Sequence, residues 1–207
     1  MEKMIAKELL KISAVFLRPE QPFTWASGIK SPIYCDNRLI LTAPSAREKV
    51  EAGLAHLVNK HFPECECLMG TSTAGIAHAA IVATLMNLPM GYVRSGAKDH
   101  GRTNRIEGKL EPGTKVVVVE DLISTGGSSL KAVEAIRNYG CEVVGMVASY
   151  TYGFDVAEKA FKEANVELVT LTNYEAVVAQ ALATGYIKEE DVELLNQWRK
   201  APSEWQG

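Results

Sequence analysis

The sequence predicts an α/β fold, in which a central, mostly parallel sheet is flanked by helices. Two observations predict it. Short apolar segments with strand character alternate along the chain with segments of helical periodicity. One strand segment, residues 116–119, is a run of β-branched residues typical of a strand covered on both faces. The 207 residues, of which 47% are hydrophobic, suffice for one full core. We therefore expect a single domain over residues 1–207, to which residues 1–40 contribute a small N-terminal hood.

The individual elements follow from local patterns. Helical segments have apolar residues three and four positions apart. They are predicted over residues 2–17, 43–61 and 154–164. A further helix is predicted to follow a turn at residues 70–75 and to end at residue 86, and another to begin after residue 129 and to end at Gly140. Two more helices are predicted near the C-terminus. Strand segments are short runs rich in β-branched and aromatic residues. Two strands, joined by a turn at Ser27 and Gly28, are predicted within residues 23–37. A short strand is predicted to end at residue 69, and further strands are predicted over residues 89–93, 115–119, 142–149 and 166–171.

Composition argues against several functional classes. The formal net charge is -3 and no basic block occurs, so nucleic acid is not the expected partner. No apolar run approaches the ~20 residues that span a bilayer, and no secretory signal is visible, so we expect no membrane association. The four cysteines lack the paired spacing of zinc ligands and fit reduced thiols of a cytoplasmic protein.

The segment from residue 116 to residue 129 is the most informative part of the chain. Glu120 and Asp121 follow the four valines, and the expected strand stops there; Leu-Ile-Ser-Thr-Gly-Gly-Ser-Ser then leads into a helix. Carboxylates accept hydrogen bonds from ribose hydroxyls. Glycines, hydroxyls and the free amides of a helix N-terminus can surround a phosphate. A carboxylate pair and a phosphate cradle therefore occur in one strand, loop and helix.

A simpler interpretation of this segment is a buried strand that ends in a glycine-rich turn. Strand-to-helix connections need only a few residues, whereas this one carries three kinds of ligand-binding group, which favours binding. The chain has no Gly-x-x-x-x-Gly-Lys-Ser/Thr sequence and no Gly-x-Gly-x-x-Gly sequence after a strand. Nucleotide hydrolysis and dinucleotide binding therefore lack support.

The alternating pattern fails between residues 94 and 109. This segment has few apolar residues, three glycines and a cluster of cations. A loop of this length is either a solvated hairpin or a lid. A flexible basic lid suits a reaction that expels pyrophosphate, because it can exclude water and neutralise the leaving group.

Together these residues resemble the type I phosphoribosyltransferases, whose motif for phosphoribosyl pyrophosphate is a hydrophobic strand, two acids and a loop containing Thr-Gly. The sequence Phe-Thr-Trp-Ala-Ser-Gly-Ile-Lys-Ser-Pro-Ile-Tyr at residues 23–34, and the loop at 94–101, resemble the branch of that family that uses orotate. The resemblance implies the type I phosphoribosyltransferase fold. It also implies a glycosyltransferase that makes orotidine 5'-monophosphate and pyrophosphate from phosphoribosyl pyrophosphate and orotate in pyrimidine biosynthesis.

The resemblance also implies a Mg2+ cofactor and a homodimer. Mg2+ is expected to be held mainly through the substrate and not by direct protein ligands, and the lid is expected to act across the dimer interface. Lys98, His100 and Asp121 are the implied catalytic residues. Phosphoribosyl pyrophosphate is expected to contact Arg94, Lys98, His100, Glu120, Asp121, Leu122, Ile123, Ser124, Thr125, Gly126, Gly127 and Ser128. Orotate is expected to contact Ser124, Ser27 and Lys30.

Four positions depart from one well-known form of this family. Ala26, Ala74 and Ser95 stand where that form has lysines, and Tyr152 stands where an arginine meets the orotate carboxylate. The group that binds this carboxylate is therefore open. The candidates are Ser27, Lys30, backbone amides near Thr151 or Ser124, and a compensating Arg102 or Arg105.

Two other functions remain open. The same fold serves regulators that bind phosphoribosyl pyrophosphate without turnover, or that bind RNA. Such a regulator is expected to lack the basic lid and to carry a basic surface or an added DNA-binding domain. A purine phosphoribosyltransferase is expected to lack the Ser-Gly-x-x-Ser-Pro segment that begins at Ser27.

Overall fold

A computed structural model of the protein describes residues 1–24, 28, 30–96, 105–202 and 204–205. The chain divides into two compact units. The larger unit comprises residues 48–171, and the smaller unit combines residues 1–47 with residues 172–207. The N-terminal segment thus shares its unit with the C-terminal helices, which the sequence patterns did not indicate. The single-domain organisation with a hood stays a prediction.

The larger unit is built on a six-stranded sheet with the strand order β10-β9-β8-β5-β6-β7. Strand β5 pairs in parallel with β6 and with β8, and β8 pairs in parallel with β9, whereas β7 is antiparallel to β6. The predicted mostly parallel sheet is thereby confirmed. The strands are β5 (Cys67–Thr71), β6 (Met90–Val93), β7 (Ile106–Glu107), β8 (Lys115–Ile123), β9 (Glu142–Thr151) and β10 (Leu168–Asn173).

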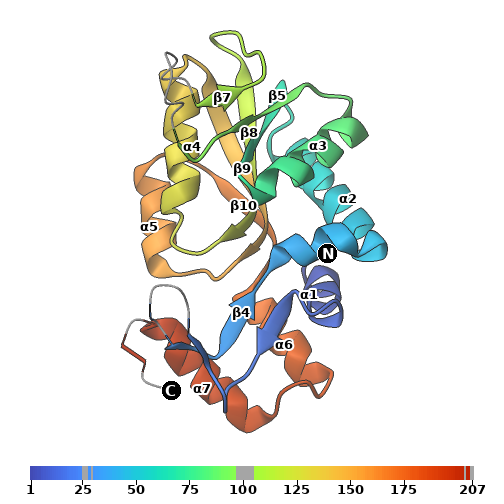
Figure 1. The fold of residues 1–207 in the computed structure, drawn as a ribbon, viewed down its shortest axis with the longest axis vertical. Helices are drawn as coiled ribbons and strands as arrows, with labels where there is room; N and C mark the ends of the chain where they lie inside the picture. Colours follow the sequence, from blue (N-terminus) through green and yellow to red (C-terminus); the bar gives the residue numbers. More distant parts are fainter. Residues whose placement is uncertain (25–27, 29, 97–104, 203, 206–207) are drawn as a thin grey trace. The chain divides into compact units, whose positions relative to one another are not determined.

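Helices cover both faces of this sheet (Figure 1). One face carries α4 (Gly127–Asn138) and α5 (Asp155–Glu163), and the other carries α3 (Ala74–Met86) and α2 (Pro44–His61). Val116 and Val118 of β8 belong to the core cluster that includes α4 and α5. Val117 and Val119 are equally buried, as expected for a strand whose side chains alternate between two covered faces.

Strand β8 is longer than its sequence predicted. It continues through Glu120 and Asp121 to Ile123, so the expectation that it stops at the two acids was wrong. The extension arises from its neighbour, because Leu122 and Ile123 pair with Tyr150 and Thr151 of β9. Tertiary pairing therefore overrides the low strand propensity of the acids. For the same reason β5, which pairs through Thr71 with Val93 of β6, passes the predicted end at residue 69.

The smaller unit contains two short antiparallel strand pairs, β1 with β4 and β2 with β3. The predicted helix over residues 2–17 is correct only to Lys11. Ser13 adopts a positive φ of 57°, which ends the helix, and the next segment joins a strand pair. The elements are α1 (Glu2–Lys11), β1 (Val15–Leu17), β2 (Phe23–Thr24), β3 (Lys30–Ser31), β4 (Ile33–Cys35), the 3-10 helix η1 (Asn37–Thr42), α6 (Tyr174–Ala183) and α7 (Glu189–Lys200).

Over the described part of the chain, no helix is both long enough and apolar enough to cross a membrane.

Candidate active site

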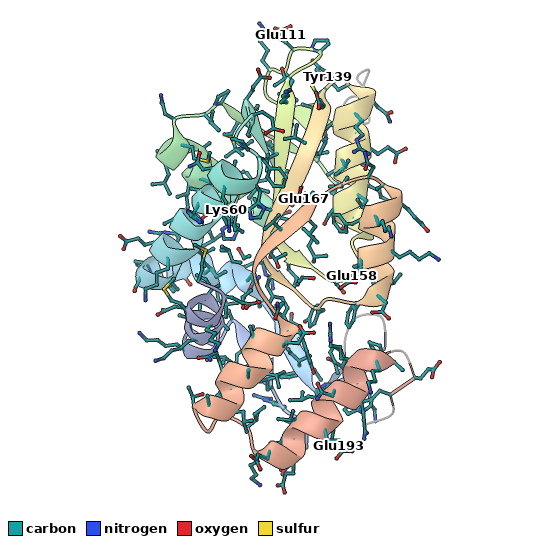
Figure 2. All side chains as sticks on the ribbon, turned by 180° about the vertical axis from the view of Figure 1, so that it is seen from behind. Lys60, Glu111, Tyr139, Glu158, Glu167 and Glu193 are labelled. Carbon is teal, nitrogen blue, oxygen red and sulfur yellow. The ribbon has the colours of Figure 1, made fainter. Side chains whose placement is uncertain are left out.

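The predicted donor-binding residues lie at one edge of the sheet in the larger unit. Strands β5 and β8 are parallel neighbours, so their carboxyl ends meet at this edge, where α3 and α4 begin. Figure 2 labels Glu111 and Tyr139 at the opposite end, where β8 starts and α4 finishes. The carboxyl edge of a parallel sheet is the usual place for a ligand, and helix N-termini there present free amides.

Glu120 is held inside this edge by two hydrogen bonds. Like Val118, it is an even-numbered residue of β8, and its side chain reaches α4, where Ser129 Oγ donates to Glu120 Oε2 over 2.8 Å. Its other oxygen, Oε1, accepts from the backbone N–H of Asp121 over 3.1 Å. Glu120 is only 8% exposed, whereas Asp121 is partly exposed. The two acids therefore differ, since Glu120 is buried and held by these bonds whereas Asp121 is partly exposed.

The pKa of Glu120 is raised to about 7, mainly by burial and next by the neighbouring Asp121 carboxylate. Hydrogen bonds from Thr71 and Ser129 act against this shift, because they stabilise the ionised carboxylate. Glu120 therefore binds a proton more readily than an ordinary carboxylate does. Perturbed carboxyl groups of this kind are concentrated at functional sites.

The loop between β8 and α4 exposes the groups that a phosphate needs. Thr125, Gly127 and Ser128 are exposed, and α4 begins without a side-chain cap. Its first amides are thus available to an anion. Gly126 adopts a φ of 80°, and a Cβ there would lie 2.7 Å from Cε2 of Phe161. Only glycine suits this position, since both the backbone conformation and the packing exclude a side chain.

A second turn, between β5 and α3, reaches the same edge. Ser72 Oγ donates to the carbonyl of Val93 over 2.6 Å, and Thr71 Oγ1 donates to that of Val119 over 3.3 Å. Gly75 leaves no room for a Cβ, because the Thr71 side chain and the Val119 carbonyl lie directly against it. Sequence reasoning located this turn but assigned it no role. Its strand, small-residue turn and helix repeat the pattern seen at β8, which was the available signal.

The base of the predicted lid is a short hairpin. The amide of Arg94 donates to the carbonyl of Arg105 over 2.8 Å, and Arg105 Nε donates back to the carbonyl of Arg94 over 2.8 Å. Arg94 Nε also lies 3.0 Å from Glu107 Oε1 on β7. Arg105, a candidate for the orotate carboxylate, is thus engaged with the backbone at the loop base. Lys98, His100 and Arg102 lie outside the described residues.

The predicted orotate-binding residues are described only in part. Ser27 lies outside the described residues, and Ser124 is partly exposed in the loop after β8. Lys30 lies on β3 in the smaller unit, where its carbonyl accepts from Trp198 Nε1 over 3.2 Å. Tyr152 is 3% exposed and its ring stacks on Phe154 with centroids 5.3 Å apart. The position expected to carry an arginine therefore forms part of an aromatic cluster.

The described residues contain no preassembled metal site. Among the described residues, no group of three or more His, Cys, Asp or Glu side chains is placed to hold an ion. The buried His78 has its Nδ1 2.6 Å from Glu51 Oε1. At the sheet edge, the partly exposed Asp121 lies beside the buried Glu120.

The sequence profile described as the phosphoribosyl transferase domain matches residues 41–183. Orotate phosphoribosyltransferase of Bacteroides fragilis is 61% identical over 206 residues, which cover 100% of this chain and 97% of that protein. Orotate phosphoribosyltransferase of Porphyromonas gingivalis is 56% identical over 203 residues, with 98% and 97% covered. These matches bear out the family resemblance that the sequence predicted.

Solved structures extend the match to three dimensions. Orotate phosphoribosyltransferase from Aeropyrum pernix superposes with a TM-score of 0.77 at 29% identity, covering 89% of this chain and 100% of that one. UMP synthase of Leishmania donovani superposes with a TM-score of 0.78 at 25% identity, covering 95% of this chain and 42% of that one. The predicted fold is thereby confirmed.

Proposed function

The chain belongs to the orotate phosphoribosyltransferase family, and on that premise we propose that it transfers the phosphoribosyl group of phosphoribosyl pyrophosphate to orotate, giving orotidine 5'-monophosphate and pyrophosphate in UMP biosynthesis. One observation carries the proposal. Glu120 and Asp121 lie near the carboxyl end of β8, which runs to Ile123 and is followed by a loop with exposed residues that leads into α4. A ribose 5-phosphate needs such a pair of neighbouring subsites, since its hydroxyls suit carboxylates and its phosphate must be kept away from them.

Each part of the substrate has its own set of residues in this proposal. Glu120 and Asp121 accept from the ribose hydroxyls, and the loop from Leu122 to Ser128 surrounds the 5-phosphate. Arg94, Lys98 and His100 contact the pyrophosphate. Orotate contacts Ser124, Ser27 and Lys30, and its carboxylate is bound by one of these side chains, by backbone amides near Thr151 or Ser124, or by Arg102.

The reaction needs no covalent bond to the protein. As the bond from ribose C1 to pyrophosphate breaks, positive charge develops on the sugar and negative charge develops on the leaving oxygens. Lys98 and Arg94 stabilise the leaving group, because fixed positive charge near a developing anion lowers the barrier. Glu120 and Asp121 hold the ribose so that the orotate ring nitrogen attacks C1 from the face opposite to pyrophosphate. His100 donates a hydrogen bond or a proton to the pyrophosphate near neutral pH.

Mg2+ is the proposed cofactor, and the residues present fit it. This ion is usually held by one or two carboxylates together with substrate phosphates, and it rarely has an all-protein cage. Asp121 is partly exposed and lies beside the proposed phosphate-binding loop, so an ion held mainly through the substrate would have a carboxylate nearby without requiring it as a direct ligand. When bound with the substrate, the ion neutralises charge on the pyrophosphate.

We further propose a homodimer in which the lid acts on the neighbouring subunit. The outer face of α3 supports the dimer. This helix has no Asp, Glu, Lys or Arg along its 13 residues. Ala77, Ile81 and Leu85 recur every four residues, so they share a face; the first two are partly exposed and Leu85 is 59% exposed. An uncharged face of this kind suits a second copy of the chain better than water.

We place the protein in the cytoplasm. Cys35, Cys65, Cys67 and Cys141 form no disulfide. Cysteines that stay reduced, three of them buried, suit a reducing compartment.

A panel of acceptor bases tests the proposed function. Orotate, uracil, hypoxanthine and xanthine are each incubated with the protein and phosphoribosyl pyrophosphate, with and without Mg2+, and pyrophosphate release is measured. We expect release with orotate only, and only when Mg2+ is present. Consumption of a purine base with orotate left untouched would overturn the assignment of the acceptor. Binding of the donor without release with any base would indicate a regulator.

A further inference from the structure

We propose that Ser129 is a positioning residue for the acid pair, whose hydroxyl holds Glu120 in the orientation that receives the ribose of phosphoribosyl pyrophosphate. The inference rests on the proposed function and adds to it a residue outside the matched donor motif. Ser129 is a buried part of α4 and touches no substrate in this proposal, so its effect passes through Glu120.

The burial of Ser129 separates it from the other hydroxyls of the segment. Ser124 is partly exposed and Ser128 is exposed, so both are open to a ligand. Ser129 is 2% exposed, and its Oγ donates to Glu120 Oε2 over 2.8 Å. A hydrogen bond to a charged acceptor in a buried setting is among the stronger ones in proteins.

The Glu120 carboxylate is held by a hydrogen bond from α4 and by another from its own strand, β8. Oε2 accepts from Ser129 on the helix, and Oε1 accepts from the amide of Asp121 on the strand. Each carboxylate oxygen can accept more than one hydrogen bond, so both keep acceptor capacity for a ribose hydroxyl. Without Ser129 the carboxylate would lose its hydrogen bond to α4 and would be restrained only from the strand side, by the Asp121 amide and by Thr71 of β5.

The same contact also affects the proton on Glu120. Burial and the Asp121 carboxylate raise its pKa to about 7, and hydrogen bonding from Ser129 is one of the interactions that lower it. Loss of the hydroxyl is therefore expected to raise this pKa further. A larger share of Glu120 would then be protonated at neutral pH, and a protonated carboxyl is a poorer acceptor for ribose hydroxyls.

Ser129 also connects the two donor subsites. It is the third residue of α4, and the first residues of that helix belong to the proposed phosphate loop. The bond to Glu120 therefore links the helix that holds the 5-phosphate to the strand that holds the ribose. The spacing between these subsites must match one rigid sugar phosphate, so a small displacement is expected to weaken donor binding.

Four variants test the inference. Ser129→Ala removes the hydroxyl, Ser129→Thr keeps it, and Ser129→Cys keeps the size with a weaker donor. Ser149→Ala is the matched control, because Ser149 is also fully buried and its hydroxyl has no hydrogen-bond partner within the described structure. Calorimetry measures the affinity for Mg2+ and phosphoribosyl pyrophosphate without orotate. Steady-state kinetics measures kcat, KM and the pH profile of kcat/KM, and circular dichroism checks folding.

We expect Ser129→Ala to raise Kd and KM for the donor about tenfold, which corresponds to about 1.4 kcal/mol, with a smaller change in kcat. The acidic limb of the pH profile should move to higher pH, because the ionised form of Glu120 loses a hydrogen bond that stabilises it. Ser129→Thr should stay within about threefold of the parent protein, and Ser129→Cys should fall between the two. Ser149→Ala should resemble the parent in every measurement.

The inference fails if folded Ser129→Ala binds the donor as the parent does and keeps its pH profile. It also fails if Ser149→Ala produces the same change, because the effect would then be general packing. If Ser129→Ala does not fold, the inference requires that Ser129→Thr binds the donor more tightly than Ser129→Cys does, and the reverse order overturns it. Calorimetry measures donor binding without orotate. If Ser129→Ala weakens donor binding as expected but the parent protein does not use orotate as an acceptor, the proposed function is overturned and this inference stands.

Discussion

At the scale of the residue, the most consequential group is the buried carboxyl of Glu120. Its pKa stands at about 7 instead of the ordinary 4.5, mainly because it is buried and then because Asp121 is adjacent. The folded protein thus binds this proton more tightly than the unfolded chain does. The free energy of unfolding is therefore expected to fall as pH rises from about 4.5 to about 7, since ionisation is easier in the unfolded state.

Glu120→Gln tests this dependence. The substitution removes the titration, so between pH 5 and pH 8 the variant should lose less stability than the parent protein, by on the order of 1–3 kcal/mol. Urea unfolding at the two pH values provides the measurement. Donor affinity should drop in the same variant, because an amide is a weaker acceptor than a carboxylate. Equal pH dependence in both proteins would contradict the raised pKa.

Gly126 is the second residue with a strict requirement. Gly126→Ala places a Cβ at a φ of 80° and 2.7 Å from the Phe161 ring, so we expect a loss of about 1–3 kcal/mol in stability. Gly127→Ala is the matched control for stability, since a Cβ there meets nothing within 4 Å and alanine favours helix. Thermal or urea unfolding of both variants distinguishes them, and equal stability would show that the loop accommodates the added methyl group.

At the scale of the element, local signals predicted β8 and α4 because both depend on neighbouring residues. The valine run favours a strand, and the glycine pair followed by helical spacing favours a loop and a helix. The end of β8 was predicted wrongly, because it depends on the partner strand β9. The roles of Thr71 and Ser129 were missed for a similar reason. Both act on Glu120 or on the neighbouring backbone through tertiary contacts that carry no local signal.

The outer face of α3 allows a prediction about assembly. Leu85→Asp adds a charge to the uncharged face, and burying that charge in a dimer would be costly, so we expect a shift toward monomer. Tyr139→Asp is the matched control, because Tyr139 is also an exposed apolar residue but follows α4. Sedimentation at several protein concentrations measures the shift. A dimer equally stable in both variants would place the interface elsewhere.

At the scale of the whole molecule, sequence patterns indicated the sheet but not the division into units. Residues 172–207 fold into the smaller unit with residues 1–47, although most of the chain separates these segments. One contact within the smaller unit illustrates this pairing of distant segments: the side chain of Asn173, directly before α6, donates a hydrogen bond to Glu2 on α1. Periodicity indicates which face of a helix is buried but not which distant segment covers it. Whether one subunit forms a whole active site or two subunits share it likewise depends on how the folded subunits associate.

Exchange between two inactive variants tests how the subunits share their sites. In the proposed dimer Lys98 acts on the neighbouring subunit, whereas Asp121 acts in its own chain. Lys98→Ala and Asp121→Asn should each be inactive alone. In a mixed dimer one site then receives both defects and the other receives neither. With equal amounts and random exchange, about half the dimers are mixed and each has one intact site of two, so activity should recover to roughly a quarter of the parent level.

The control for this experiment is direct proof of exchange, such as recovery of untagged subunits with tagged ones. If mixed dimers form and activity stays at the level of the separate variants, the lid serves its own chain, because every site in the mixture then carries one defect. Recovery with Leu85→Asp present in both variants is expected to be weaker, since the lid can reach a neighbour's site only while the dimer persists. The two experiments together thus separate the position of the interface from the sharing of the site.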